Sequence, residues 1–277
     1  MLWDRFFSDA YPPVAVYSYP YSYRMIGIFD SGSGGLTVMR AIRDRLPSSD
    51  ILYFGDIKNA PYGSRSREEL SVLTVQAIKY LQDQGAGSLV SACNSVSASL
   101  AVSLFDAFSI APQSLIEMVG PTVAYFRNSK ARILLCATPA TIQSGIYQNA
   151  FLMVGQKIET VALPNLAGAI EFGAPADEIE GNIRQAFENI SHDSFDVLIL
   201  ACTHYPLAME SFQKVLGTGK AIFDPATVVA ERVERQFWPR EAGDSKTRFV
   251  ISKDSDAFRG LVSRLFPDTT CTIEVIE

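Results

Sequence analysis

The sequence predicts an α/β protein made of two pseudo-symmetric α/β domains, with mainly parallel sheets and an active site in the cleft between them. From residue 25 onward, short apolar runs alternate with amphipathic stretches. Two of the apolar runs end in a cysteine that polar residues follow at once, at Cys93 and Cys202. Ligands of open parallel sheets bind beyond the carboxyl ends of the strands, so these two positions are candidate site residues.

The order of the expected elements favours parallel sheets. We expect strands at 26–29, 51–54, 89–92, 133–137, 159–163, 197–201, 249–251 and 272–276, where apolar residues run together. We expect helices at 35–45, 67–84, 97–106, 121–127, 140–151, 176–189, 207–215, 227–237 and 255–265. Strands that alternate with helices imply right-handed crossovers between parallel neighbours.

Two local patterns mark the starts of helices. Ser66 followed by Glu69 is the pattern of a capping box, so the helix at 67–84 should begin there. Glycines at 32, 34 and 35 follow the first strand and give a turn whose backbone amides can face a ligand. This turn lacks the acidic residue of a dinucleotide fingerprint at the end of the second strand.

An internal near-repeat divides the chain into two similar units. The spacing from Asp30 to Cys93 is almost the same as that from Thr138 to Cys202, and all four residues come at or just after a predicted strand end. We therefore predict a first α/β domain over 26–112 plus 226–277 and a second over 113–225, with the first crossing near Pro112. A cleft between two such units is a natural pocket.

Residues 1–25 form an aromatic N-terminal extension that stands apart from this pattern. The first 24 residues hold Trp3 and five tyrosines but lack the apolar core of a signal peptide. One interpretation is an upstream start codon, with Met25 as the natural start. The alternative is an aromatic arm that packs on a neighbouring surface.

Composition excludes several classes of function. The chain has 277 residues, is 48% hydrophobic and carries a net charge of −6, without a lysine or arginine stripe, so we expect no nucleic-acid partner. No apolar stretch reaches the length of a membrane span. The four cysteines form no C-x-x-C pair and there are only two histidines, so we expect no metal site and a cytoplasmic protein with reduced thiols.

A pair of opposed thiols suits one kind of chemistry. One thiolate can remove a proton from one face of a carbon while a thiol returns a proton to the other face. Cys93 and Cys202 are the candidates for these roles. Neither Cys136 nor Cys271 combines polar successors with the matching placement of Cys93 and Cys202, and we interpret them as small hydrophobic residues without a catalytic role.

Four strings of the sequence together resemble the glutamate racemases of the aspartate/glutamate racemase superfamily. They are FDSGSGGLTV at 29–38, PYG at 61–63, ACNS at 92–95 and ACTHYPL at 201–207. The resemblance covers the chain from about residue 26 to its end. It implies a cofactor-independent isomerase that interconverts L- and D-glutamate and supplies D-glutamate for peptidoglycan synthesis.

The resemblance also assigns roles to individual residues. Cys93 and Cys202 would be the catalytic acid/bases, supported by Asp30 and His204. Glu171 fits a supporting glutamate of the second domain, although the family often has two consecutive acids there and this chain has Glu171-Phe172. The substrate contacts would be Asp30, Ser31, Tyr62, Gly63, Asn94, Ser95, Thr203 and His204.

Three alternatives remain open from the sequence. The protein could racemise aspartate or another amino acid, because the spacing of residues does not fix the length of the substrate side chain. It could be a Cys-His thiol hydrolase or transferase, which needs only one essential cysteine. It could also be a binding or regulatory protein on the same scaffold. The expected partner is a small molecule, and homodimer formation is left open.

Overall fold

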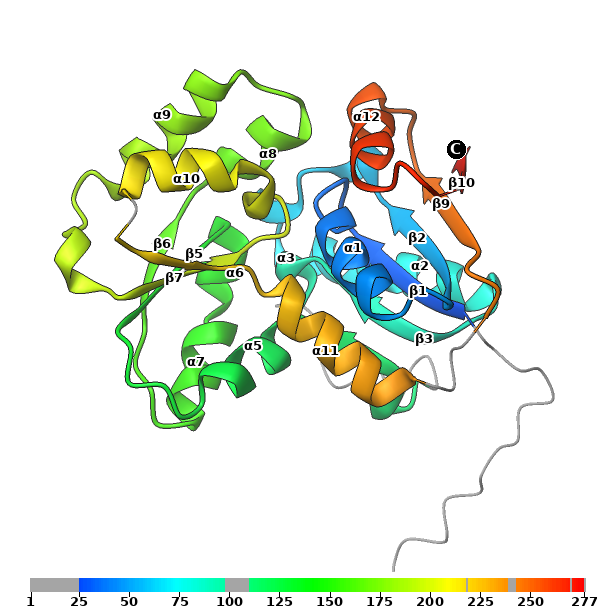
Figure 1. Ribbon diagram of the computed structural model, residues 1–277, viewed down its shortest axis with the longest axis horizontal. Helices are drawn as coiled ribbons and strands as arrows, with labels where there is room; N and C mark the ends of the chain where they lie inside the picture. Colours follow the sequence, from blue (N-terminus) through cyan, green and yellow to red (C-terminus); the bar gives the residue numbers. More distant parts are fainter. Residues whose placement is uncertain (1–24, 98–109, 218, 239–242, 270, 277) are drawn as a thin grey trace, which may run out of the picture.

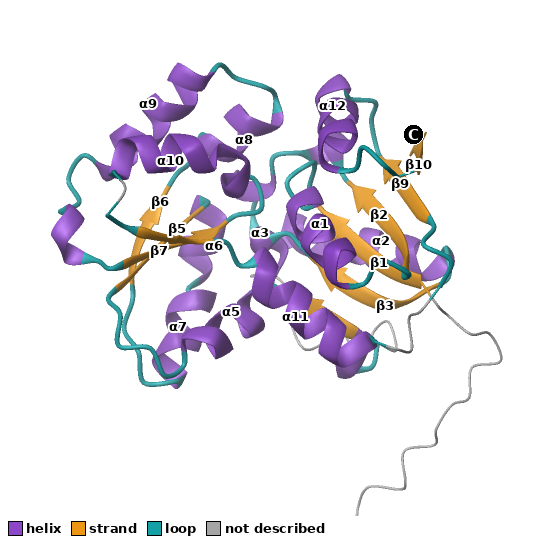
Figure 2. Cartoon of the chain, viewed as in Figure 1, coloured by secondary structure: helices purple, strands orange, loops and turns teal. Residues whose placement is uncertain are grey.

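The computed structural model describes residues 25–97, 110–217, 219–238, 243–269 and 271–276. The expected aromatic extension and most of the helix expected at 97–106 lie outside these residues. Within them, the chain forms two parallel sheets, each flanked by helices, which lie side by side as two units (Figures 1 and 2). The predicted α/β class with parallel sheets is therefore confirmed.

The larger sheet has six strands in the order β10-β9-β2-β1-β3-β4, and every neighbouring pair is parallel. The smaller sheet has four parallel strands in the order β6-β5-β7-β8. The strands are β1 Met25–Asp30, β2 Asp50–Gly55, β3 Ala86–Ser91, β4 Leu115–Glu117, β5 Ile133–Ala137, β6 Glu159–Ala162, β7 Val197–Ala201, β8 Ala221–Phe223, β9 Thr247–Ile251 and β10 Cys271–Val275.

The two sheets share one topology. The order β2-β1-β3-β4 in the larger sheet matches the order β6-β5-β7-β8 in the smaller one. In each unit the first strand is central and the next two strands lie on either side of it. Asp30 therefore ends β1 and Cys93 follows the neighbouring β3 in one sheet, and Thr138 and Cys202 follow neighbouring strands of the other.

Helices cover both faces of each sheet, and apolar residues fill the space between the layers. At the start of α2, Ser66 and Glu69 form the predicted capping box. The helices are α1 Leu36–Arg45, α2 Arg67–Asp83, α3 Asn94–Ser97, α5 Val119–Phe126, α6 Pro139–Ser144, α7 Ile146–Met153, α8 Leu166–Glu171, α9 Ala176–Phe187, α10 Met209–Leu216, α11 Ala226–Phe237 and α12 Asp256–Leu265.

Helix α11 returns the chain from the smaller sheet to the larger one. It follows β8 and packs against α1, where Val229, Val233 and Phe237 join the core on that side of the six-stranded sheet. In Figure 1 it runs below the junction of the two units. Strands β9 and β10 then extend the larger sheet beyond β2.

Some expected elements were wrong in detail. The helix expected at 140–151 is two helices, because Gly145 adopts a left-handed conformation with φ of 68° and ends α6. The sequence analysis missed β4, β8 and α8, each only three to six residues long. Strand β4 pairs with β3, so 115–117 belong to the larger sheet, beyond the crossing expected near Pro112. The division into domains itself stays a prediction.

Candidate active site

Both candidate cysteines line one pocket between the two sheets. Cys93 comes just after β3 of the larger sheet, and Cys202 comes just after β7 of the smaller one. All the predicted site residues except Asp30 and Glu171 line this pocket. Its lining consists of Ser31, Pro61, Tyr62, Gly63, Cys93, Asn94, Ser95, Thr138, Ala167, Cys202, Thr203 and His204.

The pocket is nearly closed. The centre of a water molecule can move in only about 10 Å³ of it, which is room for about one water. Cys93 and Cys202 are 5% and 6% exposed, so solvent barely reaches either sulfur. An amino acid could enter only if the two units moved apart or a wall segment moved aside.

Cys93 lies on the wall formed by the larger sheet. Its thiol donates a hydrogen bond to the Ser31 hydroxyl over 3.6 Å. Burial, and after it the negative charge of Asp30, raises the pKa of the Cys93 thiol to about 12. In the closed pocket Cys93 is therefore a neutral thiol at neutral pH.

Cys202 lies beside a histidine on the opposite wall. Its Sγ is 3.9 Å from Nδ1 of His204, and Nε2 of His204 is 2.5 Å from Oε2 of Glu171. Burial alone would lower the pKa of His204, but its contacts with Cys202 and Glu171 outweigh burial and hold that pKa well above its ordinary value. The Cys202 sulfur thus has a protonated imidazole as its neighbour.

Glu171 supports this histidine from behind the pocket. Burial would raise the pKa of its carboxyl, but the contacts with His204 and then with Ser33 lower it below its ordinary value. Glu171 is 2% exposed and sits at the end of α8. Its carboxylate is therefore buried behind the pocket wall and is not exposed to solvent.

Asp30 also lies behind the pocket wall. Its Oδ1 accepts a hydrogen bond from the Gly32 amide over 2.9 Å, and its Oδ2 accepts one from the Thr203 hydroxyl over 3.0 Å. Burial is the main reason that the pKa of Asp30 is raised. Because Thr203 follows β7 of the other sheet, this bond joins the two units at the site.

Further hydrogen bonds cross between the units around the pocket. The hydroxyls of Ser95 and Thr138 are 2.9 Å apart, and the Tyr147 hydroxyl donates to Oδ1 of Asn94 over 2.6 Å. Nδ2 of Asn94 is buried and has no hydrogen-bond partner among the described residues. The pocket wall therefore holds a free amide donor.

The Tyr62–Gly63 turn is built for close contact with the second unit. The Tyr62 hydroxyl donates to Asp56 over 2.6 Å, which holds the ring in place. A Cβ atom at Gly63 would come within 2.7 Å of the Thr138 side chain. The turn therefore needs glycine here for packing, beyond the needs of an ordinary proline-initiated turn.

The glycine-rich turn after β1 differs from the expectation. Its amides do not all face a ligand, because the Gly32 amide donates to Asp30 and the Ser33 amide donates to Glu171. A Cβ atom at Gly34 would come within 2.6 Å of His204. The glycines thus let the turn approach residues of the second unit closely.

The sequence analysis missed three residues that line the pocket, Pro61, Thr138 and Ala167. Thr138 follows β5 in the same way as Asp30 ends β1, so the near-repeat already marked its position. The signal was present, but no role was drawn from it. Pro61 and Ala167 carry no polar side-chain group, and nothing in the sequence distinguished them.

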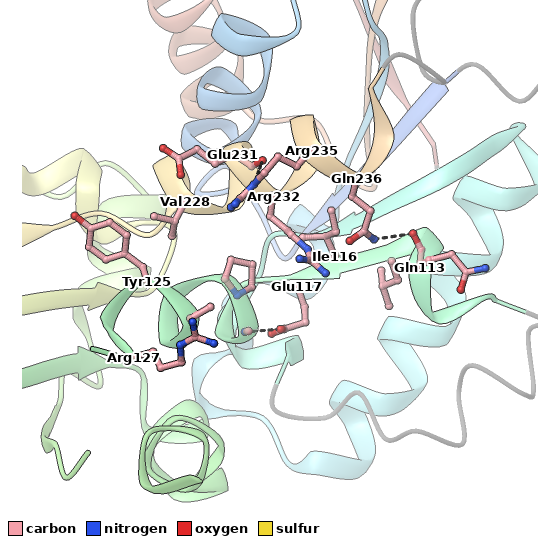
Figure 3. A pocket seen from close by; sticks show the side chains of 14 residues that line it. Gln113, Ile116, Glu117, Tyr125, Arg127, Val228, Glu231, Arg232, Arg235 and Gln236 are labelled. Carbon is pink, nitrogen blue, oxygen red and sulfur yellow. Dashed lines mark hydrogen bonds between the residues drawn. The ribbon is translucent and has the colours of Figure 1, made fainter. Parts of the chain in front are cut away.

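A larger groove of about 940 Å³ lies apart from the cysteines, between α5 and α11 (Figure 3). Arg127, Arg232 and Arg235 line it together with Glu117 and Glu231. It contains neither cysteine. In the part of the chain that the structure describes, no group of acidic, cysteine and histidine side chains could hold a metal ion, and no helix is long and apolar enough to cross a bilayer.

Comparison with known proteins places the chain in a family. The family model described as Asp/Glu/Hydantoin racemase matches residues 27–233. A glutamate racemase of Desulforudis audaxviator is 35% identical over 253 residues, which cover 86% of this chain and 92% of that protein. One of Aquifex aeolicus is 35% identical over 234 residues, which cover 84% and 91%.

Solved structures agree with these relatives. Glutamate racemase isoform RacE1 from Bacillus anthracis superposes with a TM-score of 0.81 at 29% identity, covering 93% of this chain and 98% of that one. Glutamate racemase from Francisella tularensis, solved with D-glutamate, superposes with a TM-score of 0.80 at 27% identity and the same coverage. Because the family model matches most of the length of this chain, the chain belongs to the Asp/Glu/Hydantoin racemase family and is an isomerase.

Proposed function

We propose that the protein is a cytoplasmic, cofactor-independent glutamate racemase that supplies D-glutamate for peptidoglycan synthesis. One observation carries the proposal: a cysteine from each of the two sheets lines the same closed pocket. The names of the relatives support glutamate as the substrate. The substrate contacts and catalytic roles assigned from the sequence are part of this proposal, except that Asp30 takes a supporting role in place of a direct substrate contact.

Inverting a stereocentre needs one base on each face. The α-hydrogen of an amino acid is weakly acidic, so a thiolate must remove it while the site stabilises the carbanion that forms. In the proposed step the C–H bond breaks toward one sulfur, its electron pair stays on the α-carbon and the α-carboxylate, and the other thiol gives its proton to the opposite face. The thiol and the thiolate have then exchanged places.

The surroundings of the two sulfurs indicate which one acts first as base. Cys93 has a pKa of about 12 in the closed pocket, so it starts as the thiol. Cys202 lies beside the protonated His204, and a cation is the partner that a thiolate needs. We therefore assign Cys202 as the base in the first half of the reaction and Cys93 as the proton donor.

The neighbouring polar groups would hold the substrate. The hydroxyls of Ser31 and Ser95 and the free amide of Asn94 line the pocket and can donate to the α-carboxylate, whose negative charge grows in the transition state. Asp30 and Glu171 do not line the pocket. We assign them supporting roles behind Thr203 and His204, rather than the direct substrate contact expected of Asp30.

The test is proton NMR of L-glutamate in deuterium oxide with the purified protein. The wild type should lose the α-proton signal while D-glutamate appears. Cys93→Ala and Cys202→Ala should each abolish racemisation, whereas Cys271→Ala, which changes a half-buried cysteine of β10 far from the pocket, should not. Near wild-type turnover in either of the first two variants would refute the two-cysteine mechanism.

NMR with aspartate, mass spectrometry and a binding measurement separate the alternatives. Exchange with aspartate and none with glutamate would indicate another substrate of the family. A covalent acyl-enzyme in the mass spectrum, together with only one essential cysteine, would indicate a thiol hydrolase or transferase. Tight binding of glutamate without exchange of its α-proton would indicate a binding protein.

A further inference from the structure

We propose that Ser33 is a positioning residue for the reaction: its hydroxyl reaches from the β1–α1 turn of one unit to Glu171 of the other and holds that carboxylate against His204. This inference rests on the proposed racemase function. The sequence analysis assigned no role to Ser33, and Ser33 does not line the pocket.

Three donors meet on one oxygen of Glu171. The Ser33 amide lies 2.9 Å and the Ser33 hydroxyl 2.8 Å from Oε2, and Nε2 of His204 lies 2.5 Å from the same atom. The other oxygen, Oε1, is buried and has no hydrogen-bond partner among the described residues. The orientation of the carboxylate therefore depends on Ser33 and His204.

The carboxylate also packs directly on the turn. A Cβ atom at Gly32 would come within 2.6 Å of Oε2 of Glu171. The turn itself does not need the Ser33 side chain, since the Ser33 amide would still donate with alanine at this position. Replacing Ser33 by alanine thus removes one hydrogen bond and leaves the backbone contact.

The Ser33–Glu171 bond links the larger unit to the Cys202 sulfur through Glu171 and His204. Ser33 follows β1 of the larger sheet, whereas Glu171 ends α8 beside the smaller one. Moving the units apart by a few ångströms to admit an amino acid would break the bond, and closing them would form it again. Glu171 then fixes His204, whose Nδ1 faces the Cys202 sulfur.

The groups around Glu171 determine in which direction loss of the Ser33 hydroxyl shifts the pH dependence of the reaction. His204 and the Ser33 donors lower the pKa of Glu171 against the effect of burial. Asp30 of β1 and Tyr53 of β2 are further titratable groups that interact with this carboxylate. Loss of the Ser33 hydroxyl therefore raises the pKa of Glu171. The carboxylate then becomes protonated at a higher pH than in the wild type, and His204 loses its charged partner at that pH.

The experiment measures racemisation against pH for the wild type, Ser33→Ala and Ser33→Thr. We expect Ser33→Ala to lower kcat about tenfold, with little change in KM, and to shift the acidic limb of the kcat profile to higher pH. Ser33→Thr keeps the hydroxyl and should restore both. Ser49→Ala is the matched control, because its buried hydroxyl has no hydrogen-bond partner among the described residues.

A double-mutant cycle tests whether Ser33 acts through Glu171. In a Glu171→Gln background, Ser33→Ala should change the α-proton exchange rate less than about twofold. An equal loss in both backgrounds, or an unshifted acidic limb, would overturn the inference. Ser33→Gly replaces Ser33→Ala if the alanine variant does not fold. If the wild type itself exchanges no glutamate α-proton, the proposed function fails instead.

Discussion

The hydrogen bond between Tyr147 and Asn94 allows a quantitative prediction. Tyr147 lies on α7 and is fully buried, and its hydroxyl donates to Oδ1 of Asn94 over 2.6 Å. Burial raises the pKa of Tyr147, so the hydroxyl is a neutral donor throughout the working pH range. Tyr147→Phe keeps the ring and its packing but removes this donor.

The expected loss in the free energy of unfolding follows from the acceptor that Tyr147→Phe leaves without a donor. Oδ1 of Asn94 would lose its donor in a site where Asn94 is 2% exposed, and a buried polar group left unsatisfied costs about 1–3 kcal/mol. For a chain of this size, that loss lowers the melting temperature by about 2–4 °C per kcal/mol. The Asn94 amide would also lose its fixed orientation in the pocket, so we expect KM for glutamate to rise by up to about tenfold.

Chemical denaturation, thermal unfolding and steady-state racemisation measure these effects. Tyr125→Phe is the matched control, because Tyr125 is 60% exposed and stacks on Phe223 with 4.9 Å between the ring centroids. We expect it to leave stability and KM unchanged. If Tyr147→Phe proves as harmless as Tyr125→Phe, the claim that this bond holds Asn94 across the two units is wrong.

Two further predictions concern the Glu171–His204 pair and Gly63. His204→Gln should lower the free energy of unfolding most between about pH 4.5 and 6.5. The raised pKa of His204 gives a stabilising contribution that is complete below pH 6.5 and is lost as pH rises through the raised value. The lowered pKa of Glu171 gives a stabilising contribution that is complete above pH 4.5 and is lost as pH falls through the lowered value. Denaturation across a pH series measures this, and a difference that is greatest well above pH 8 would contradict it. Gly63→Ala should reduce kcat/KM at least tenfold, because its Cβ would press on Thr138, whereas Gly181→Ala on α9, with nothing within 4 Å of its Cβ, should not; equal activities of the two variants would rule this out.

The sequence predicted those features that depend on regular patterns. Apolar runs located the central strands, and the polar residues after them located Cys93 and Cys202, because parallel strands bring their carboxyl ends to one edge. The near-repeat predicted two similar units, and the matching strand orders bear this out. The resemblance to glutamate racemases supplied Glu171, which no periodicity marked.

Features that depend on contact between the units could not be predicted in this way. Ser33 and Glu171 are far apart in the sequence, and only the packing of α8 against the turn after β1 brings them together. The sequence analysis assigned no role to Tyr147, and its bond to Asn94 depends on the break at Gly145, after which α7 begins. The short strands β4 and β8 carry too few residues for a period to be recognised.

The unequal surroundings of the two sulfurs limit how the enzyme can treat the two enantiomers. Cys93 faces the negative charge of Asp30, whereas Cys202 faces the protonated His204. L- and D-glutamate have equal free energies in water, so kcat/KM must be the same in both directions whatever the site contains. An asymmetric site can therefore favour one direction only by changing kcat and KM together. In the proposed two-cysteine mechanism, the enantiomer that needs Cys93 as base binds the form of the enzyme in which the proton lies on Cys202. We therefore expect kcat and KM for the two enantiomers to differ by the same factor.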